Sequence, residues 1–579
     1  MTNPSDTVPE FSIANLTSAE QNLLALIPDE EQRSVLYREL LYQRGIEPPI
    51  DLSVAENVLI YEYLWKKVFN GHILPEGDTK YIKYISAYGE GTLRENMAAR
   101  LSESLGANVD KEDVFGVAGV GSALQSIALG LQQPLPQSTR GPVPVPAGST
   151  VLLPAPFWQG FYWSFNQTPK LWCVPVDLMV NGSENFKLDL KDLQRAYKNH
   201  STPKLLALTN PHNPLGVNYE EELLKDIYTW VLTETDMHII SDEIYCHSQL
   251  EGAQPKFVSA LKLMNEHHDE WEPYNAKERV HVVWGFAKDF GLSGFRAGFV
   301  ISKSDYVKNA MKGDGEGRAT LSWFTPFDSL KHFYIEPIAG NKETWDEAMK
   351  THQGALAASF KAVAGVLQEY NKIDERIKFV HEEGANSTLF FWLDLREFLP
   401  SDPTPQDELD LREKITNNAK VQLLPGTTMA CKWPGYFRLC FTACGIDVVK
   451  DATENICKYL HMSCPVNLEN KTGKTITDVK IRHTCDNYVD ECYPRNMASS
   501  ETIKRASVAY YKTGEKYKNG WYIEFNDGED LYESENNPDC YDLTETAAGQ
   551  AIEMNFDTEN LSVKYPDSSI PCKIKINKI

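Results

Sequence analysis

One stretch of this chain decides its fold: Ala287-Lys288-Asp289-Phe290-Gly291-Leu292-Ser293-Gly294-Phe295-Arg296. The apolar run Val282-Val283-Trp284 precedes it and predicts a buried strand, so Lys288 stands where a strand gives way to a loop. A lysine beside an apolar wall can lose its proton and attack a carbonyl carbon, and Arg296 offers a planar fork for a phosphate. The pair suits an aldehyde cofactor that carries a phosphate. An isolated Lys–Arg pair, however, is more often a surface lysine near an unrelated ion pair.

Two further polar clusters decide between these interpretations. The strand-like run 205–208 leads into Asn210-Pro211-His212-Asn213-Pro214-Leu215-Gly216, and the run 238–240 leads into Ser241-Asp242-Glu243-Ile244-Tyr245. Open α/β sheets bind their ligands at the carboxyl ends of their strands. Three such clusters predict an α/β fold with a mostly parallel sheet and a site for pyridoxal 5′-phosphate (PLP).

From about residue 45 to about residue 455, the chain resembles the fold-type I PLP-dependent enzymes, the superfamily of the class I and II aminotransferases. Its pattern is most similar to that of the 1-aminocyclopropane-1-carboxylate (ACC) synthases. Two segments carry this closer likeness: Leu52-Ser53-Val54-Ala55-Glu56-Asn57 and Leu389-Phe390-Phe391-Trp392-Leu393-Asp394-Leu395-Arg396. The resemblance implies a large PLP-binding domain and a small α/β domain.

The resemblance assigns chemistry to the residues around the cofactor ring. Lys288 is expected to bind PLP covalently and later to move the Cα proton of the substrate. Asp242 is expected to pair with the pyridine nitrogen, because an adjacent carboxylate keeps that nitrogen protonated. Asn213 and Tyr245 would bind O3′ of the ring. Arg438 would clamp the substrate carboxylate with a bidentate fork, and a structural glutamate is its alternative partner.

A second group of residues is expected to hold the cofactor phosphate and the flat face of the ring. In register with the resembled family, Val120, Gly121 and Ser122 form the phosphate cradle together with Arg296. Small residues at a helix start let backbone N–H groups approach an anion. Trp158 matches the aromatic residue that stacks on the ring. Aminotransferases usually have tryptophan there and the ACC synthases tyrosine, so Trp158 leaves the reaction type open.

Two expectations concern the neighbouring subunit and the substrate. The resemblance implies a homodimer in which a tyrosine reaches the cofactor phosphate of the other subunit, and Tyr88 fits this role better than Tyr84. Glu56 is expected to orient the substrate, although a glutamate before a helix is most often a partner of the helix dipole. The chain also departs from the family pattern, since Gly285 and Ala287 stand where phosphate-binding serines are usual.

Composition limits the partners and the compartment. With 81 acidic and 57 basic residues, the chain of 579 residues has a formal net charge of -24. Nucleic acids and anionic membranes require a basic surface, so neither is an expected partner. The start has no signal-peptide pattern and no run of 18 apolar residues occurs, so a cytoplasmic protein is expected. The 11 cysteines include no CxxC pair, and therefore no metal site is expected. A disulfide framework among the last five is possible but not favoured.

Changes of pattern divide the chain into four parts. Residues 1–45 predict an N-terminal helical arm, 46–330 a large PLP-binding domain, and 331–460 a small domain that includes part of the N-terminal segment. Short runs with period-two alternation after residue 460 predict a β-sandwich-like domain at 461–579. This last domain has no catalytic constellation, so a binding or oligomerisation module, or a lid, is expected there.

Three functions compete at this point. The first is an ACC-synthase-like enzyme that deprotonates the Cα of S-adenosylmethionine and releases methylthioadenosine from Cγ, with ring closure or capture of Cγ by another nucleophile. The second is an aminotransferase, which uses the same cofactor contacts. The third is a PLP-fold binding module without catalysis, which the intact site residues disfavour. Glu56 favours the first function and Trp158 the second.

Overall fold

The computed structural model describes most of the chain from residue 48 to residue 578. The gaps before residue 463 are 74–78, 133–143, 179–185, 314–320 and 381–386. Further gaps interrupt the C-terminal strands at 473, 486–487, 493–496, 498–499, 511–518, 528–529, 535–536, 541–551, 558 and 565–571. The predicted arm at residues 1–45 lies outside the described residues.

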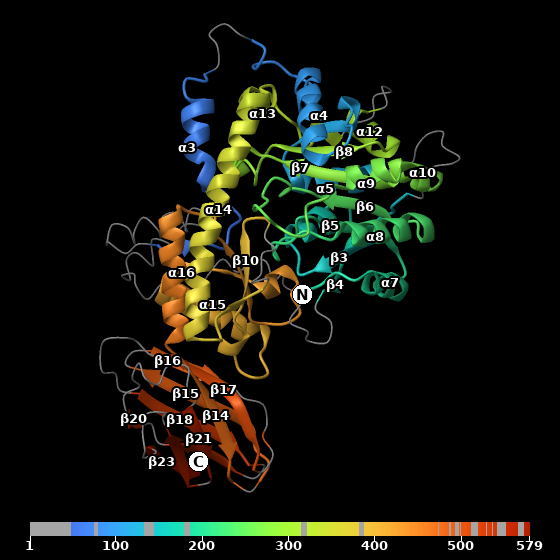
Figure 1. Ribbon diagram of the computed structural model, residues 1–579. Helices are drawn as coiled ribbons and strands as arrows, with labels where there is room; N and C mark the ends of the chain where they lie inside the picture. The colour runs from blue at the N-terminus through green and yellow to red at the C-terminus, as the bar shows by residue number, and fades with distance from the viewer. Residues whose placement is uncertain are drawn as a thin grey trace.

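A seven-stranded sheet forms the centre of the large part of the molecule (Figure 1). Its strands, in spatial order, are β2 (Val114–Val117), β8 (Gly298–Ser302), β7 (Val280–Gly285), β6 (His238–Asp242), β5 (Pro203–Thr209), β3 (Thr150–Ala155) and β4 (Trp172–Asp177). Strands β4, β3, β5, β6 and β7 run parallel to one another. Strand β8 is antiparallel to β7, and β2, which pairs antiparallel with β8, runs in the same direction as the other five. Most of these strands are buried along their whole length, because helices cover both faces of a parallel sheet.

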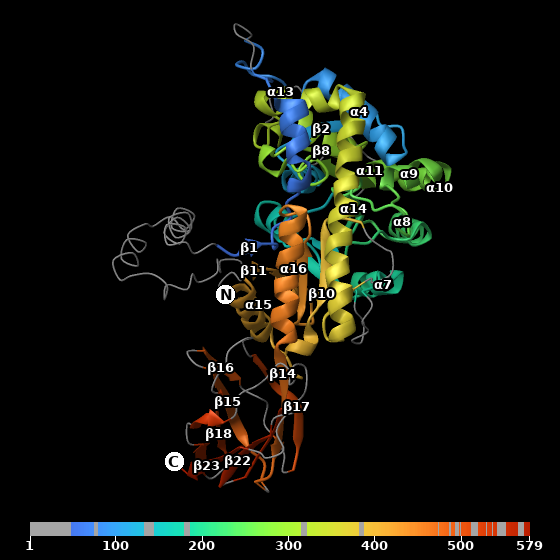
Figure 2. The ribbon, with the colours of Figure 1, turned by 60° about the vertical axis from the view of Figure 1, so that its left-hand side comes forward.

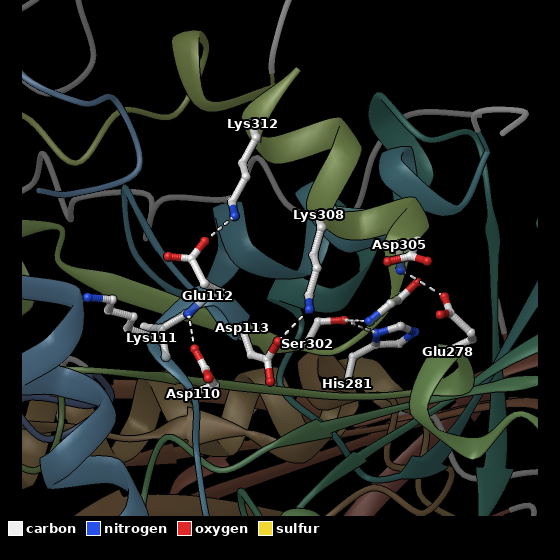
Figure 3. Close-up of polar contacts among 12 residues, drawn as sticks. Asp110, Lys111, Glu112, Asp113, Glu278, His281, Ser302, Asp305, Lys308 and Lys312 are labelled. Carbon is white, nitrogen blue, oxygen red and sulfur yellow. Dashed lines mark hydrogen bonds and ion pairs between the residues drawn. The ribbon is translucent and has the colours of Figure 1, made fainter. Parts of the chain in front are cut away.

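Helices surround this sheet: α4 (Gly91–Leu105), α5 (Val120–Leu131), α7 (Leu190–Asn199), α8 (Glu221–Glu234), α9 (Ala260–Glu266), α10 (His268–Trp271), α11 (Ala276–Arg279), α12 (Asp305–Lys312) and α13 (Ser329–Ala339). The short helices α3 (Tyr61–Tyr63) and α6 (Gly160–Tyr162) complete the set. Figure 3 shows how α12 is held at the sheet edge, where Lys308 Nζ lies 2.5 Å from Asp113 and Lys312 pairs with Glu112.

The second part is built on a four-stranded antiparallel sheet. Its strands, in spatial order, are β12 (Leu424–Pro425), β13 (Tyr436–Cys440), β10 (Phe390–Asp394) and β9 (Lys378–Phe379). Strand β1 (Ile50–Asp51) pairs in parallel with β11 (Val421–Gln422), which brings the N-terminal segment to this part. The covering helices are α14 (Lys342–Ile373), α15 (Pro405–Ala419) and α16 (Ile446–His461). Helix α14 has 32 residues and passes beside both sheets (Figures 1 and 2).

The C-terminal strands form a ten-stranded sheet apart from the other two (Figures 1 and 2). They are β14 (Ser463–Asn470), β15 (Thr477–Cys485), β16 (Tyr488–Cys492), β17 (Thr502–Tyr510), β18 (Asn519–Asn526), β19 (Leu531–Ser534), β20 (Asn537–Cys540), β21 (Ile552–Phe556), β22 (Asn560–Lys564) and β23 (Cys572–Lys578). Val466 of β14 and Ile481 of β15, far apart in the strand order, share one apolar core. The sheet must therefore curl so that its inner face closes on itself.

The predicted fold class is confirmed: a mixed, mostly parallel α/β sheet, a smaller α/β sheet and an appended all-β region. The domain boundaries at about residues 330 and 460 stay predictions. The side chains of the five cysteines after residue 460 lie outside the described part, and the six described cysteines are free thiols. No helix in the described residues is both long enough and apolar enough to cross a bilayer.

Candidate active site

The predicted site residues come from the carboxyl ends of adjacent parallel strands. Asn213 follows β5, Asp242 ends β6 and Lys288 follows β7. Arg438 lies on β13 of the smaller sheet and reaches across to Asn213, with Nη1 3.0 Å from the amide Oδ1. The site therefore joins the two sheets, and neither sheet contains all of it.

Lys288 is held by a backbone carbonyl and not by a carboxylate. Its Nζ donates to the oxygen of Ala55 at 2.6 Å. Burial lowers the pKa of Lys288, the nearby Arg438 lowers it further, and the charge of Glu56 partly opposes this shift. A partly buried lysine with a lowered pKa is more readily neutral, which is the form that attacks an aldehyde carbon.

Asp242 is a buried carboxylate with little compensation from the protein. Only 3% of the residue is exposed, and its Oδ1 accepts a hydrogen bond from the Ile244 amide at 3.3 Å. Burial raises the pKa of Asp242 to about 7, against the opposing effects of that amide and of Lys288. A cationic group beside Asp242 would restore the ionised form. A protonated pyridine nitrogen fits this requirement.

Arg438 is a buried cation whose described partners carry no full negative charge. Besides Asn213, its guanidinium donates to the backbone oxygen of Ser53 at 2.6 Å and stacks 4.3 Å from the centre of the Phe390 ring. Its Nε has no hydrogen-bond partner among the described residues, and burial lowers its pKa. Of the two partners considered for Arg438, a structural glutamate and the carboxylate of a ligand, these contacts favour the second. No carboxylate of the described residues pairs with the guanidinium, so it can bind an incoming one.

The two residues predicted to bind O3′, Asn213 and Tyr245, lie next to Arg438. Asn213 Nδ2 lies 3.5 Å from the hydroxyl of Tyr245, and both side chains are buried. The Asn213 amide therefore stands between the tyrosine and the guanidinium. It can turn either its N–H groups or its oxygen toward a ligand.

The residues of the predicted anion cradle lie at the start of α5. Gly119, with φ of +90°, precedes the helix, and the Arg296 guanidinium lies so close that a Cβ at Gly119 would be 2.7 Å from its Nη2. The first backbone N–H groups of a helix have no acceptor within that helix. In α5 these N–H groups belong to Val120, Gly121 and Ser122. Four predicted phosphate ligands therefore converge on one helix start.

Gly285 has a packing reason for departing from the family pattern. A Cβ there would lie 2.8 Å from the oxygen of Ala297 and 3.0 Å from the Cα of Gly298. The backbones of β7 and β8 approach too closely for any side chain. The absence of a serine is thus a consequence of close strand packing, and Gly285 offers no side chain to a phosphate.

Trp158 stands beside this cradle. Its ring lies 3.8 Å from the Cβ position of Gly121 and fills the space that a side chain at Gly160 would need, since a Cβ there would be 2.1 Å from the indole. The ring also makes edge contacts with Phe161 and Trp163, at centroid distances of 5.9 and 6.1 Å. The indole is therefore fixed in place before any ligand binds.

Glu56 and the two candidate tyrosines lie at the edge of the site. Both carboxylate oxygens of Glu56 accept from the Ser293 hydroxyl at 2.8 Å. Tyr88 packs its ring against Phe115 and Arg94 of its own chain, whereas Tyr84 is 92% exposed. The partner-reaching role of Tyr88 stays a prediction, as do the roles of the other site residues.

Sequence reasoning missed several groups that shape this site. The backbone oxygen of Ser53 accepts from Arg438, and that of Ala55 accepts from Lys288. Every residue has a backbone oxygen, so no sequence pattern predicts which one acts as an acceptor. A buried network also connects Asn57, His352 and Asp289 near Lys288. Asp289 could have been noticed as a carboxylate at the exit of an apolar strand. His352 lies in the middle of a long helix and gives no such signal.

Comparison with known proteins shows the family. The model of aminotransferase class I and II matches residues 76–456. An ACC synthase of Cucurbita maxima is 29% identical over 343 residues, which cover 58% of this chain and 67% of that protein. ACC synthase 8 of Arabidopsis thaliana is 26% identical over 462 residues, or 78% of this chain and 91% of that protein.

Solved structures share the fold. Aspartate aminotransferase of Thermus thermophilus with maleate matches with a TM-score of 0.54 and 20% identity, over 76% of this chain and 99% of that one. Aromatic aminotransferase of Pyrococcus horikoshii matches with a TM-score of 0.52 and 19% identity, over 71% and 95%. With the family match and the residues that fit the cofactor, the chain belongs to the PLP-dependent class I and II aminotransferase family and has its fold-type I architecture.

Proposed function

We propose that this PLP-dependent enzyme acts on S-adenosylmethionine and expels methylthioadenosine from its Cγ, as an ACC-synthase-like enzyme. The observation that carries the proposal is the position of Glu56, a carboxylate fixed at the edge of the Lys288 site. It is held by two hydroxyl groups, that of Ser293 and, at 3.5 Å, that of Tyr61. Neither partner cancels its negative charge, so Glu56 can attract a cationic sulfonium group. The curated relatives named above are ACC synthases.

The residues of the chain divide the work of binding. Arg438 clamps the α-carboxylate of the substrate, and Asn213 with Tyr245 binds O3′ of the cofactor. Val120, Gly121, Ser122 and Arg296 hold the phosphate, while Trp158 stacks on the face of the ring and fixes its orientation. These contacts fix the Cα–H bond in one orientation, and orientation of this kind can contribute several kcal/mol, on the order of 7.

Lys288 and Asp242 handle the protons. Bound PLP supplies an electron sink that makes the Cα–H bond of an amino acid acidic. Asp242 would pair with the pyridine nitrogen and keep that nitrogen protonated. Lys288 would bind the cofactor covalently between turnovers and would take the Cα proton of the substrate. The Cγ–S bond then breaks, the sulfur leaves with the bonding electron pair, and Cα or another nucleophile forms the new bond to Cγ.

An aminotransferase is the second candidate function. Trp158 favours it, because aminotransferases usually have tryptophan at this position. The two reactions share each of the contacts above and differ only after Lys288 has taken the Cα proton. For transamination Lys288 would have to return the proton, and the product would be a keto acid.

We also infer a homodimer as the active assembly. Three aromatic residues have most of their surface exposed in the single chain: Tyr84 (92%), Trp323 (61%) and Phe324 (81%). The ring centroids of Tyr84 and Trp323 lie 5.8 Å apart. Exposed aromatic groups of this kind suit a protein interface. They lie in the same stretches of chain as Tyr88 and Thr325, and Thr325 bonds the Ala118 amide at the anion cradle. A second subunit on this face would therefore approach the phosphate site.

One experiment separates the two reactions. The enzyme is incubated with S-adenosylmethionine, and methylthioadenosine is followed by chromatography, beside a panel of amino acids with 2-oxoglutarate. We expect methylthioadenosine from the wild type and a rate at least about tenfold lower from Glu56→Gln, which keeps the shape but not the charge. Glutamate formation without methylthioadenosine would reject the proposal and support the aminotransferase.

A further inference from the structure

A second buried polar cluster adjoins Lys288, and the cofactor contacts make no use of it. Asp289 is fully buried. Its carboxylate accepts hydrogen bonds from the Ser248 hydroxyl at 2.7 Å, the Trp284 indole N–H at 3.1 Å and the His247 amide at 3.3 Å. A buried carboxylate needs donors of this number, and here they hold it in one place. Asp289 is thus a fixed acceptor directly after Lys288 in the chain.

The hydrogen bonds that lead away from Asp289 have one consistent direction. Ser248 gives its single proton to Asp289, so its oxygen accepts from Nε2 of His352 at 3.1 Å. The Nδ1 atom of His352 is then an acceptor, and Nδ2 of Asn57 lies 3.0 Å from it. The same Asn57 nitrogen donates to the backbone oxygen of Lys288 at 2.9 Å. Burial lowers the pKa of His352 to about 3, which keeps the ring in the neutral form that this arrangement needs.

Asn57 ends the segment 52–57, which covers Lys288. The oxygen of Ala55 in this segment accepts the hydrogen bond of the lysine amine at 2.6 Å. The backbone oxygen of Asn57 packs against Gly291, where a Cβ would be 2.3 Å from it. Gly291 has a φ of +66°, which also favours glycine there. The segment 52–57 therefore contacts the Lys288 loop at two places, through the oxygen of Ala55 and through the oxygen of Asn57.

We propose that Asn57, His352, Ser248 and Asp289 form a relay of positioning residues that sets where the Lys288 amine stands. The relay joins the lysine backbone to the covering segment and to α14, which carries His352 and passes beside both sheets (Figures 1 and 2). The described hydrogen bonds of these four residues go to one another and to neighbouring protein groups, so the relay acts through Lys288. The proposal rests on the proposed function in one respect, namely that Lys288 is the residue that binds PLP.

Two substitutions at one position test the relay. His352→Phe keeps an aromatic ring, though a somewhat larger one, but removes both the donor and the acceptor, so it breaks the relay at its centre. His352→Gln keeps one acceptor for Asn57 and one donor for Ser248, so it should restore the relay. His281→Phe is the matched control. That histidine is equally buried and bonds Ser302 at 2.8 Å (Figure 3), but it lies toward the amino end of β7, away from Lys288.

Two measurements report on the lysine without requiring turnover. The first is hydrogen exchange of the peptide that spans residues 52–60 in protein freed of PLP. The second is the rate at which added PLP becomes covalently attached, followed by its visible absorption. For His352→Phe we expect exchange about tenfold faster and attachment about tenfold slower, the effect of losing two buried hydrogen bonds. His352→Gln and His281→Phe should stay within about twofold of the wild type, even where thermal unfolding shifts.

The outcomes separate the relay from the proposed function. If His352→Phe changes both rates no more than His281→Phe does, His352 has a merely structural role and the relay is wrong. Failure of His352→Gln to recover the rates would also contradict it, because the hydrogen-bond pattern and not the imidazole is what the relay requires. If the wild type itself attaches PLP at another lysine, shown by borohydride reduction and peptide mapping, the fault lies in the proposed function.

Discussion

Asp242 and Glu243 are neighbours at the end of β6, but they differ in how many hydrogen bonds the protein gives them. Both are buried, and burial raises the pKa of each to about 7. Glu243 accepts hydrogen bonds from Ser259 Oγ at 2.7 Å, the Ala260 amide at 2.8 Å and Ser241 Oγ at 2.9 Å. Asp242 accepts a longer one, from the Ile244 amide at 3.3 Å. Adjacent side chains of a strand face opposite sides of the sheet, so one carboxylate can serve the fold while the other faces the site.

The same contrast separates two arginines. Arg376 makes two hydrogen bonds to Asp374, Nε to Oδ1 at 2.9 Å and Nη2 to Oδ2 at 2.7 Å. Arg438 is more deeply buried than Arg376 but donates to an amide oxygen and a backbone oxygen. A buried charge with a complete set of partners stabilises the structure, and one without such a set marks where a ligand of opposite charge fits.

The largest expected effect is at Lys288. Lys288→Ala removes the only group proposed to bond the cofactor and to move the Cα proton. PLP should bind without a covalent link, and turnover should fall by at least about 10²- to 10⁴-fold, the usual contribution of a proton-transfer group. Borohydride reduction followed by peptide mapping checks this, and a label on another lysine would overturn the assignment.

The contrast between the two carboxylates is tested directly by isosteric amides. Asp242→Asn should fold normally and lose most activity, because an amide cannot keep the pyridine nitrogen protonated. Glu243→Gln should lose stability, by about 1–3 kcal/mol, because its buried donors lose a charged acceptor. Activity per folded molecule should persist in Glu243→Gln. Activity assays with chemical unfolding of both variants measure the two effects, and equal behaviour of the pair would break the comparison.

The pH dependence of stability sharpens the same point. Since folding raises the pKa of Asp242 from 3.8 to about 7, the folded state holds a proton that the unfolded state has lost. The contribution of this group to stability is thus complete below about pH 3.8 and is lost as the pH rises to about 7. Asp242→Asn has no such loss, so without PLP its stability should increase relative to the wild type over this range. Thermal unfolding at several pH values tests this, and bound PLP should remove the difference.

A smaller effect is expected where the chain departs from the family pattern. Gly285→Ser should not improve phosphate binding, because its Cβ would press on the oxygen of Ala297 at 2.8 Å. Overpacking of this kind costs about 1–3 kcal/mol. Ala287→Ser is the control, since the side chain there is only half-buried. Titration with PLP and unfolding curves compare them, and tighter PLP binding by Gly285→Ser would contradict the packing argument.

The sequence alone was sufficient to predict those features that depend on residues close together in the chain. Lys288 and Asp242 could be placed at strand ends, because an apolar run followed by a polar cluster is a local pattern. The pairing of Asn57 with His352 could not be predicted, since the two lie 295 positions apart in the chain and no local pattern marks His352 as its partner. The reason for Gly285 was equally hidden, because it depends on how closely β8 approaches β7.

The smallest effect on the site is expected from removing the C-terminal sheet. That sheet has its own apolar core, and only Met462 separates α16 from β14. Arg376 donates to the hydroxyl and the carbonyl oxygen of Ser463, at 3.0 and 3.1 Å. A chain ended after Met462 loses these two acceptors but keeps the ion pair of Arg376 with Asp374. We expect a loss of about 1–3 kcal/mol in stability, at roughly 1 kcal/mol for each hydrogen bond. Covalent PLP attachment should be unchanged, as visible absorption and unfolding curves of the shortened chain can show. Loss of the cofactor on truncation would mean that the C-terminal sheet supports the site. The hydrogen bonds of Arg376 to Ser463 would then affect cofactor binding as well as stability.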